Sequence, residues 1–246
     1  MLADITFHHI YSKSDLHRPI EFCLQALGNS IRLDLGLGYF SSASFNVLSL
    51  GMAQFIVNNG CMNLYINEYV SIDDYALLKG NYDEKFDDEL VTSFTSLKKT
   101  FDQRDEHFFK CLAYLIATNR VNIKIIVLAD GGLPHEKYGI FTDEVGNRIH
   151  FTGSAILGNL ETIECTCSWK GDDSREKVLS LEQHFHKVWN GECEGVKIYN
   201  AKHFCNNIMT TYPNQDPENL LRKEKEFLAI YNVQMKSVSN DAPHFP

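Results

Sequence analysis

The sequence predicts an α/β protein whose mixed, largely parallel sheet is flanked by helices. Short apolar runs of strand type alternate along the chain with longer segments in which apolar residues follow helical spacing. Residues 31–66 fit a strand, a helix and a second strand, a unit that makes two parallel strands with a helix on the sheet face. Two later strands flank a short polar turn, which indicates a hairpin.

The composition excludes several classes of protein. The 246 residues are 44% hydrophobic and 22% charged, unlike a disordered, collagen-like or coiled-coil chain. No stretch approaches the roughly 18 apolar residues of a membrane span. The chain does not open on the basic and apolar regions of a secretory signal, and its seven scattered cysteines are typical of reduced thiols. We therefore expect a cytoplasmic protein that does not bind a membrane.

Charge and proline content suggest how the chain is divided. The net charge of −9 argues against a general polyanion binder, although a local basic site is compatible with it. We expect one domain over residues 1–206. Residues 207–246 are polar and hold four of the six prolines, so we expect a surface helix over 217–231 and a Pro-containing tail or linker.

The first half of the chain supplies three strands and two helices. Residues 31–40 alternate as in a strand, residues 45–57 have helical spacing, and Asn58-Asn59-Gly60 ends that helix in a left-handed turn. A second strand spans 62–66. The acidic cluster Asp83, Glu84, Asp87, Asp88 and Glu89 indicates a solvated helix face. Further core-facing helical residues are Phe108, Cys111, Leu112, Leu115 and Ile116, and a strand buried on both faces spans 122–129.

The second half begins with a loop at 130–134. Strands are expected at 136–141 and 149–152, joined by the turn residues 143–147. A further strand is expected at 164–169. Residues 174–189 carry a clear amphipathic helical pattern, which ends at Asn190-Gly191.

The candidate chemistry lies on the strand at 136–141. His135, Lys137 and Gly139 alternate along it and therefore share one face. A nucleophile or base, a cation and a bare glycine in a row suggest a cradle for a phosphate. The next strand ends in Gly153-Ser154, which brings a hydroxyl and free backbone N–H groups beside that cradle.

These residues resemble the phospholipase D superfamily, and more narrowly the nuclease-like domains of restriction enzymes and of the N-terminus of bacterial defence helicases. The resemblance covers roughly residues 15–200. The matching segments are His135-x-Lys137, Phe151-Thr152-Gly153-Ser154, Asn159-Leu160-Glu161, Ser168-Trp169 and the block from Leu35 to Ser42. The resemblance implies a phospholipase D-like α/β/α sandwich.

The same resemblance implies a metal-independent phosphodiesterase that forms a covalent phosphohistidine. His135 becomes the nucleophile or acid/base, and Lys137 stabilises the charged phosphoryl oxygens. Ser154 donates a hydrogen bond to the phosphate. Glu161 orients His135, a role for which Glu164 competes.

Four further residues are expected to bind the substrate: Gly153, Asn159, Tyr39 and Ser41. The family has Asn two residues after the Gly-Ser serine, where this chain has Ile156, and Asn159 is the candidate replacement. The family also often has Asp where this chain has Thr142.

A single His-x-Lys implies a homodimer, because family members with one copy form the site from two chains on a two-fold axis. The expected substrate is DNA, the setting restriction or anti-phage defence, and a helicase or another defence protein a possible partner. The alternatives are a non-catalytic dimerisation or DNA-sensing module and a lipid or small-diester phosphodiesterase. No amphipathic basic helix supports the lipid alternative.

No metal or cofactor is expected. The spacing of Cys165, Cys167, Cys193, His203 and Cys205 matches no common zinc pattern. His184 and His186 lie on different sides of a helix and do not chelate one ion together.

Overall fold

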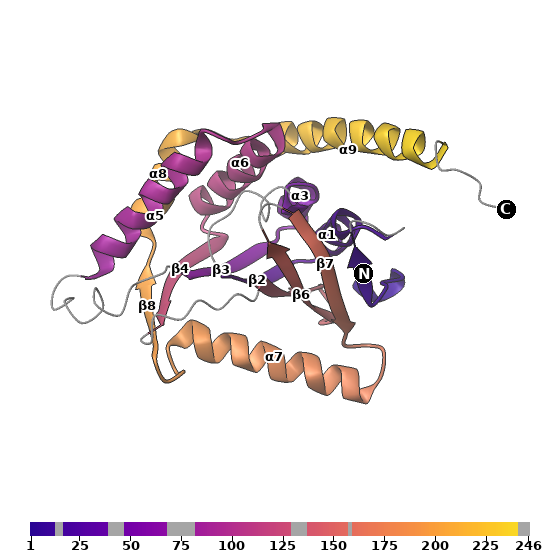
Figure 1. The fold of residues 1–246 in the computed structure, drawn as a ribbon, viewed down its shortest axis with the longest axis horizontal. Coiled ribbons are helices and arrows are strands. Elements are labelled where there is room, and N and C mark those ends of the chain that lie inside the picture. Colours follow the sequence, from indigo (N-terminus) through magenta and orange to yellow (C-terminus); the bar gives the residue numbers. More distant parts are fainter. Residues whose placement is uncertain (13–16, 39–46, 68–81, 129–136, 157–158, 241–246) are drawn as a thin grey trace.

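The computed structural model describes residues 1–12, 17–38, 47–67, 82–128, 137–156 and 159–240 as one eight-stranded sheet flanked by seven α-helices (Figure 1). The strands are β1 (Ile10–Ser12), β2 (Arg32–Leu37), β3 (Cys61–Asn67), β4 (Val121–Leu128), β5 (Lys137–Thr142), β6 (Arg148–Ile156), β7 (Asn159–Cys167) and β8 (Val196–Asn200). The helices are α1 (Pro19–Gly28), α3 (Met52–Val57), α5 (Tyr82–Lys98), α6 (Gln103–Ala117), α7 (Asp172–Asn190), α8 (Lys202–Thr211) and α9 (Pro217–Asn240).

The sheet is mixed, as the sequence predicts, but it is not largely parallel. Its order is β1-β7-β6-β5-β2-β3-β4-β8. Only β2–β3 and β3–β4 are parallel pairs, and the other five pairings are antiparallel. The prediction of a largely parallel sheet is therefore wrong. Two of the antiparallel pairs, β5–β6 and β6–β7, follow from short connections, which join only antiparallel neighbours.

Helices cover both faces of the sheet, as the sequence predicts for a mixed sheet flanked by helices. The main core lies on one face, where it combines Phe22 of α1, Phe55 of α3, Phe94 of α5, Phe108 of α6 and Phe204 of α8. A second, smaller cluster lies on the other face. There Phe185 of α7 packs with Tyr65 and Ile126 of the sheet. In Figure 1, α7 lies by itself on this face among the described helices.

Most element boundaries agree with the sequence, but β6 continues to Ile156, past the expected end at 152, and α9 continues to Asn240, past the expected end at 231. Two further differences have a local cause. The helix expected over 45–57 is broken at Gly51, which has a left-handed φ of 103°, so α3 begins only at Met52. The strand expected from 164 begins earlier, at Asn159, because its first residues pair with the end of β6. The predicted end of α7 is confirmed: Gly191 is a left-handed C-cap with φ 74°.

The hairpin turn between β5 and β6 is fixed by Asp143. Its carboxylate accepts hydrogen bonds from the backbone N–H groups of Val145, Asn147 and Leu2 and from the amide of Asn147. Although burial acts in the opposite direction, these bonds hold the pKa of Asp143 below its ordinary value. The turn therefore sets the register of the two strands that carry the candidate site.

One member of the acidic cluster is not solvated. Asp87 is 2% exposed, and its carboxylate accepts hydrogen bonds from the backbone N–H groups of His203 and Phe204 in the first turn of α8. Phe86 and Leu90 of the same helix are buried in the main core. The expectation of a solvated face is thus wrong for Asp87, because a distant helix N-terminus needs an acceptor there.

The C-terminal helix α9 lies on the surface, as the sequence predicts, and packs one face on the helices of the main layer. Glu224 of α9 is 2% exposed and accepts hydrogen bonds from the N–H groups of Ala53 and Gln54 at the start of α3. His107 of α6 lies 3.6 Å from the same carboxylate. Residue 206, where a boundary was expected, lies inside α8. Among the described residues, no helix combines the length and apolar composition that crossing a membrane requires.

Replacing Glu224 is expected to destabilise the fold. Glu224→Ala leaves two helix N–H groups without their acceptor, which should lower the free energy of unfolding by about 2–3 kcal/mol. Glu226→Ala is the matched control, because Glu226 makes only exposed ion pairs on the same helix. Urea unfolding measures both variants. Equal effects of the two changes would contradict the anchoring role of Glu224.

A second prediction concerns pH. His150 of β6 is 7% exposed; burial, together with the nearby Lys177, lowers its pKa to about 4. Folding therefore opposes its protonation, and the stability it contributes is complete above its unfolded pKa of about 6.5 and is lost as the pH falls toward 4. We expect the free energy of unfolding, measured in urea, to be about 2 kcal/mol lower at pH 5 than at pH 7 because of His150.

His150→Gln should remove that part of the pH dependence, whereas His184→Gln, at an exposed position of α7, should retain it. The same pH dependence in both variants would show that another group is responsible.

Candidate active site

The described part of the predicted site lies where β5, β6 and β7 run side by side. Lys137 is the first residue of β5 and pairs directly with Gly153 of β6. Gly153 pairs with Ile163 of β7, and Ser154 pairs with Thr162. The strand register thus brings the lysine of the His-x-Lys motif and the Gly-Ser pair to adjacent positions.

Not every predicted residue is described. His135, Tyr39 and Ser41 lie outside the described residues. At Lys137, Ser154, Asn159 and Glu161 the structure describes the path of the backbone. These four residues are therefore compared by their positions along the strands.

The β6–β7 hairpin places Asn159 beside Ile156. Ile156, which stands where the resembling family has Asn, pairs with Asn159 across the β6–β7 hairpin. Directly paired residues of antiparallel strands have Cβ atoms about 4.5–5.5 Å apart. The replacement residue and the position that lacks the amide are therefore direct neighbours in the sheet.

Glu161 occupies an irregular position. Ser154 pairs with Thr162, but the next residue, Ala155, pairs with Leu160. Glu161 is therefore the extra residue of a β-bulge, and bulges commonly re-aim a side chain next to an active site. The bulge has no signal in the sequence, because it arises from the pairing of two strands.

Gly139 does not serve the cradle that the sequence suggests. A Cβ at this position would lie 2.7 Å from the Phe151 ring and 2.9 Å from the backbone oxygen of Asp34. The absent side chain makes room for the main core and for the neighbouring strand β2. The interpretation of Gly139 as space for a phosphate is thus wrong.

A shallow pocket of about 200 Å³ lies beside the Gly-Ser strand. It is lined by Thr152, Gly153, Thr162 and Glu164. Glu164 is exposed and pairs with Thr152, so it is an acidic group at a described position next to Gly153.

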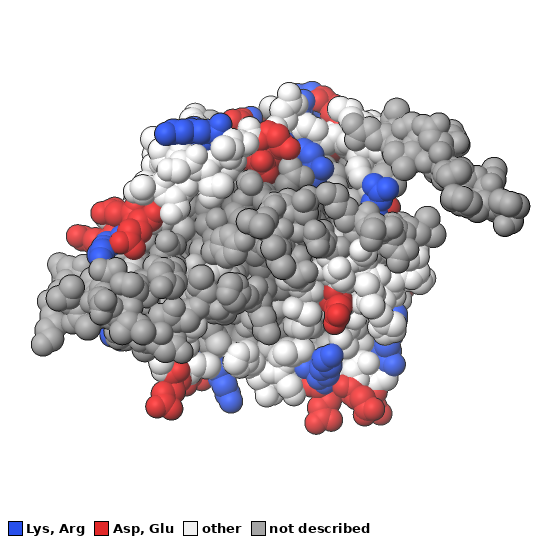
Figure 2. Space-filling model, viewed as in Figure 1, with Lys and Arg blue, Asp and Glu red and all other residues white. Residues whose placement is uncertain are grey.

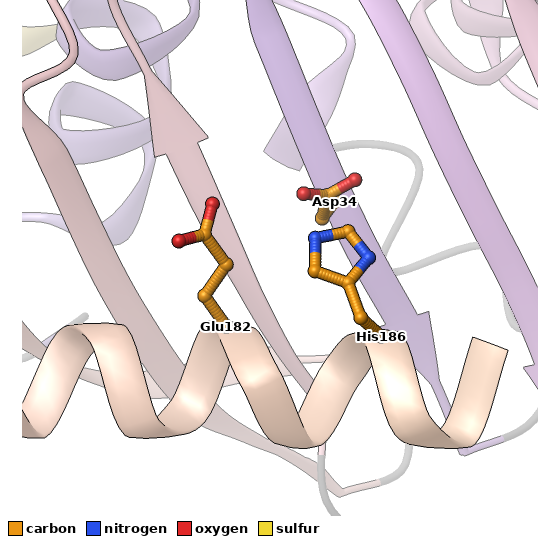
Figure 3. Close-up of side chains that lie close together, drawn as sticks. All are labelled: Asp34, Glu182 and His186. Atoms are coloured by element: carbon orange, nitrogen blue, oxygen red, sulfur yellow. The ribbon is translucent and has the colours of Figure 1, made fainter. Parts of the chain in front are cut away.

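The structure also brings together three residues that the sequence did not connect. Asp34 of β2 faces Glu182 and His186 of α7, and their ligand atoms all lie within 4.8 Å of one another (Figure 3). His186 therefore has one neighbour on its own helix, Glu182, and one on the sheet, Asp34, and neither is the His184 that the sequence considered. Asp34 pairs with Ile140, three residues beyond Lys137 on β5, so this cluster lies about 10 Å along the strand from the candidate phosphate site.

Comparison with known proteins assigns this chain to no family. No protein-family model matches the chain, and no curated protein matches its sequence.

Gly139→Ala tests the packing role of this glycine. The new methyl group would push on the Phe151 ring and on the β2 backbone, and we expect a loss of about 1–3 kcal/mol in the free energy of unfolding. Gly28→Ala is the control, because a Cβ there meets only the Gln54 side chain at 3.8 Å. Thermal unfolding compares the two. A neutral Gly139→Ala would mean that β2 and β5 separate easily at this point.

Proposed function

We propose that the protein is a phosphodiesterase of the phospholipase D type that cleaves DNA without a metal ion, in restriction or anti-phage defence. The observation that carries this proposal is the register of β5 and β6, in which Lys137 lies opposite Gly153 and next to Ser154. A cation and a glycine at directly paired positions leave room for a tetrahedral phosphate, and Ser154 follows at the point where the β6–β7 ladder becomes irregular.

In the proposed reaction, a ring nitrogen of His135 attacks phosphorus. A P–N bond forms, the P–O bond to one DNA end breaks, and the leaving oxygen takes a proton from His135 of the partner subunit. That second imidazole then removes a proton from water, and the resulting attack on phosphorus breaks the P–N bond. Lys137 and Ser154 stabilise the negative charge on the equatorial oxygens in both steps.

Two acidic residues are candidates for orienting His135. Glu161 has the bulge position, and Glu164 is exposed beside Gly153. A carboxylate that accepts the second ring N–H fixes the tautomer of an attacking imidazole. The variants Glu161→Gln and Glu164→Gln distinguish the two candidates, because only replacement of the orienting residue should lower kcat.

The charge distribution suggests weak affinity for DNA. Of the basic residues near the motif, Arg148 contacts Glu182, Lys170 donates to the carbonyl of Phe7, and Arg175 pairs with Asp172. On the face shown in Figure 2, described acidic and basic side chains are interspersed and form no stripe of one sign. With a net charge of −9, we propose that a helicase or another defence protein supplies non-specific affinity.

A nuclease assay in excess EDTA tests this function, with single-stranded, duplex and supercoiled DNA at low salt. We expect cleavage to persist in EDTA and to fall by about 10³-fold or more in His135→Ala and Lys137→Met. His184→Ala, an exposed change on α7, is the control and should cleave normally. Size-exclusion chromatography with light scattering tests the dimer.

Three outcomes would contradict the proposal. Loss of cleavage in EDTA by a protein that circular dichroism shows to be still folded would exclude a phosphohistidine mechanism of this kind. Cleavage that survives His135→Ala would exclude this nucleophile. DNA binding by a folded dimer without cleavage would favour the non-catalytic module, in which Ile156 marks a lost phosphate contact.

A further inference from the structure

Three side chains with metal-binding chemistry meet where α7 crosses the sheet. Glu182 and His186 are one helical turn apart, so they share the face of α7 that lies over β2 (Figure 3). Asp34 reaches them from β2 and is fully buried, while the other two are half-buried. One carboxylate oxygen or imidazole nitrogen of each lies within 4.8 Å of the others.

The two oxygens of the Asp34 carboxylate are held differently. The Oδ1 atom accepts a hydrogen bond of 2.8 Å from the side-chain amide of Asn63 and one of 3.2 Å from Nη2 of Arg32. Its Oδ2 atom lies 2.9 Å from the Arg32 guanidinium, yet it receives no hydrogen bond of good geometry. The charge of Arg32 therefore compensates this buried oxygen without a directed hydrogen bond, which leaves Oδ2 available as a ligand atom if the guanidinium moves away.

The Arg32 guanidinium lies between Asp34 and His186, but not all of its N–H groups make hydrogen bonds. Its Nη2 atom lies 3.2 Å from Nε2 of His186, and its buried Nε atom has no hydrogen-bond partner. The Arg32 side chain is 39% exposed, so it has a short path into solvent. The guanidinium therefore lies among the possible ligand atoms without satisfying them fully.

We propose that Asp34, Glu182 and His186 bind one divalent transition-metal ion, for which Zn²⁺ is the best match, and that the ion displaces the Arg32 guanidinium. One imidazole nitrogen and two carboxylate oxygens are a donor set that suits Zn²⁺, with water in the remaining position. Asn63 would hold the Asp34 carboxylate in place. Arg148, whose Nε atom lies 3.0 Å from Glu182, would hold the second carboxylate.

The ion would connect α7 to the centre of the sheet. Of the described helices, α7 is the one that covers this face, so the site would fasten that layer. This inference does not depend on the proposed nuclease, because the cluster and the His-x-Lys strand end are separate positions on the sheet.

Metal binding to the full-length chain, after EDTA treatment and dialysis, tests the inference. We expect isothermal titration with Zn²⁺ to give one ion per chain, and Co²⁺ to give visible absorption bands of a low-coordinate nitrogen and oxygen site. Zn²⁺ should also raise the melting temperature. Asp34→Asn and His186→Ala should weaken binding by about tenfold or more, whereas His184→Ala, exposed on the same helix, should not.

Arg32→Gln separates a metal site from a merely structural ion pair. Because it removes the competing cation, this variant should bind Zn²⁺ about tenfold more tightly. A misfolded variant would not show such a gain. The inference is overturned if the wild type binds no stoichiometric ion, if binding is the same in His186→Ala, or if Arg32→Gln binds more weakly.

Discussion

The antiparallel pairing of β2 with β5 is the contact on which the rest of the structure depends. It joins the parallel strands β2, β3 and β4 to the antiparallel set β5, β6 and β7, and so makes one sheet from two kinds of connection. Gly139 lies at this junction, opposite Leu35, where a side chain would meet the Phe151 ring and the backbone of Asp34. Close approach of the two backbones therefore fixes the position of β5, and with it the position of Lys137.

The two faces of this junction are stabilised differently. One face is covered by six described helices that share a large apolar core, to which α9 is fastened by the buried carboxylate of Glu224. The other face has α7, a small aromatic cluster around Phe185, and the polar groups Asp34 and Arg32 beneath the helix. Because a buried carboxylate requires compensation by charge or hydrogen bonds, the position of α7 is coupled to the electrostatics at β2.

The proposed phosphodiester site and the proposed metal site lie on different strands of one sheet and use different chemistry. The first lies at the strand ends, where Lys137, Gly153 and Ser154 occupy adjacent positions and the Glu161 bulge interrupts the ladder. The second lies further inside the sheet, under α7. Strand ends are open to a large substrate such as DNA, whereas a site between helix and sheet has room for a single ion. A metal-independent reaction and a structural ion are therefore compatible in one chain.

The sequence by itself determined the elements that depend on local pattern: the α7 helix with its glycine cap, the hairpin at Asp143, and the order of His-x-Lys and Gly-Ser strands. It did not determine the short edge strands β1 and β8, the burial of Asp87 and Glu224, or the meeting of Arg32 with His186, which are 154 positions apart. Only the tertiary structure decided these, because a charged residue shows its role only when a distant helix end or strand supplies its partner.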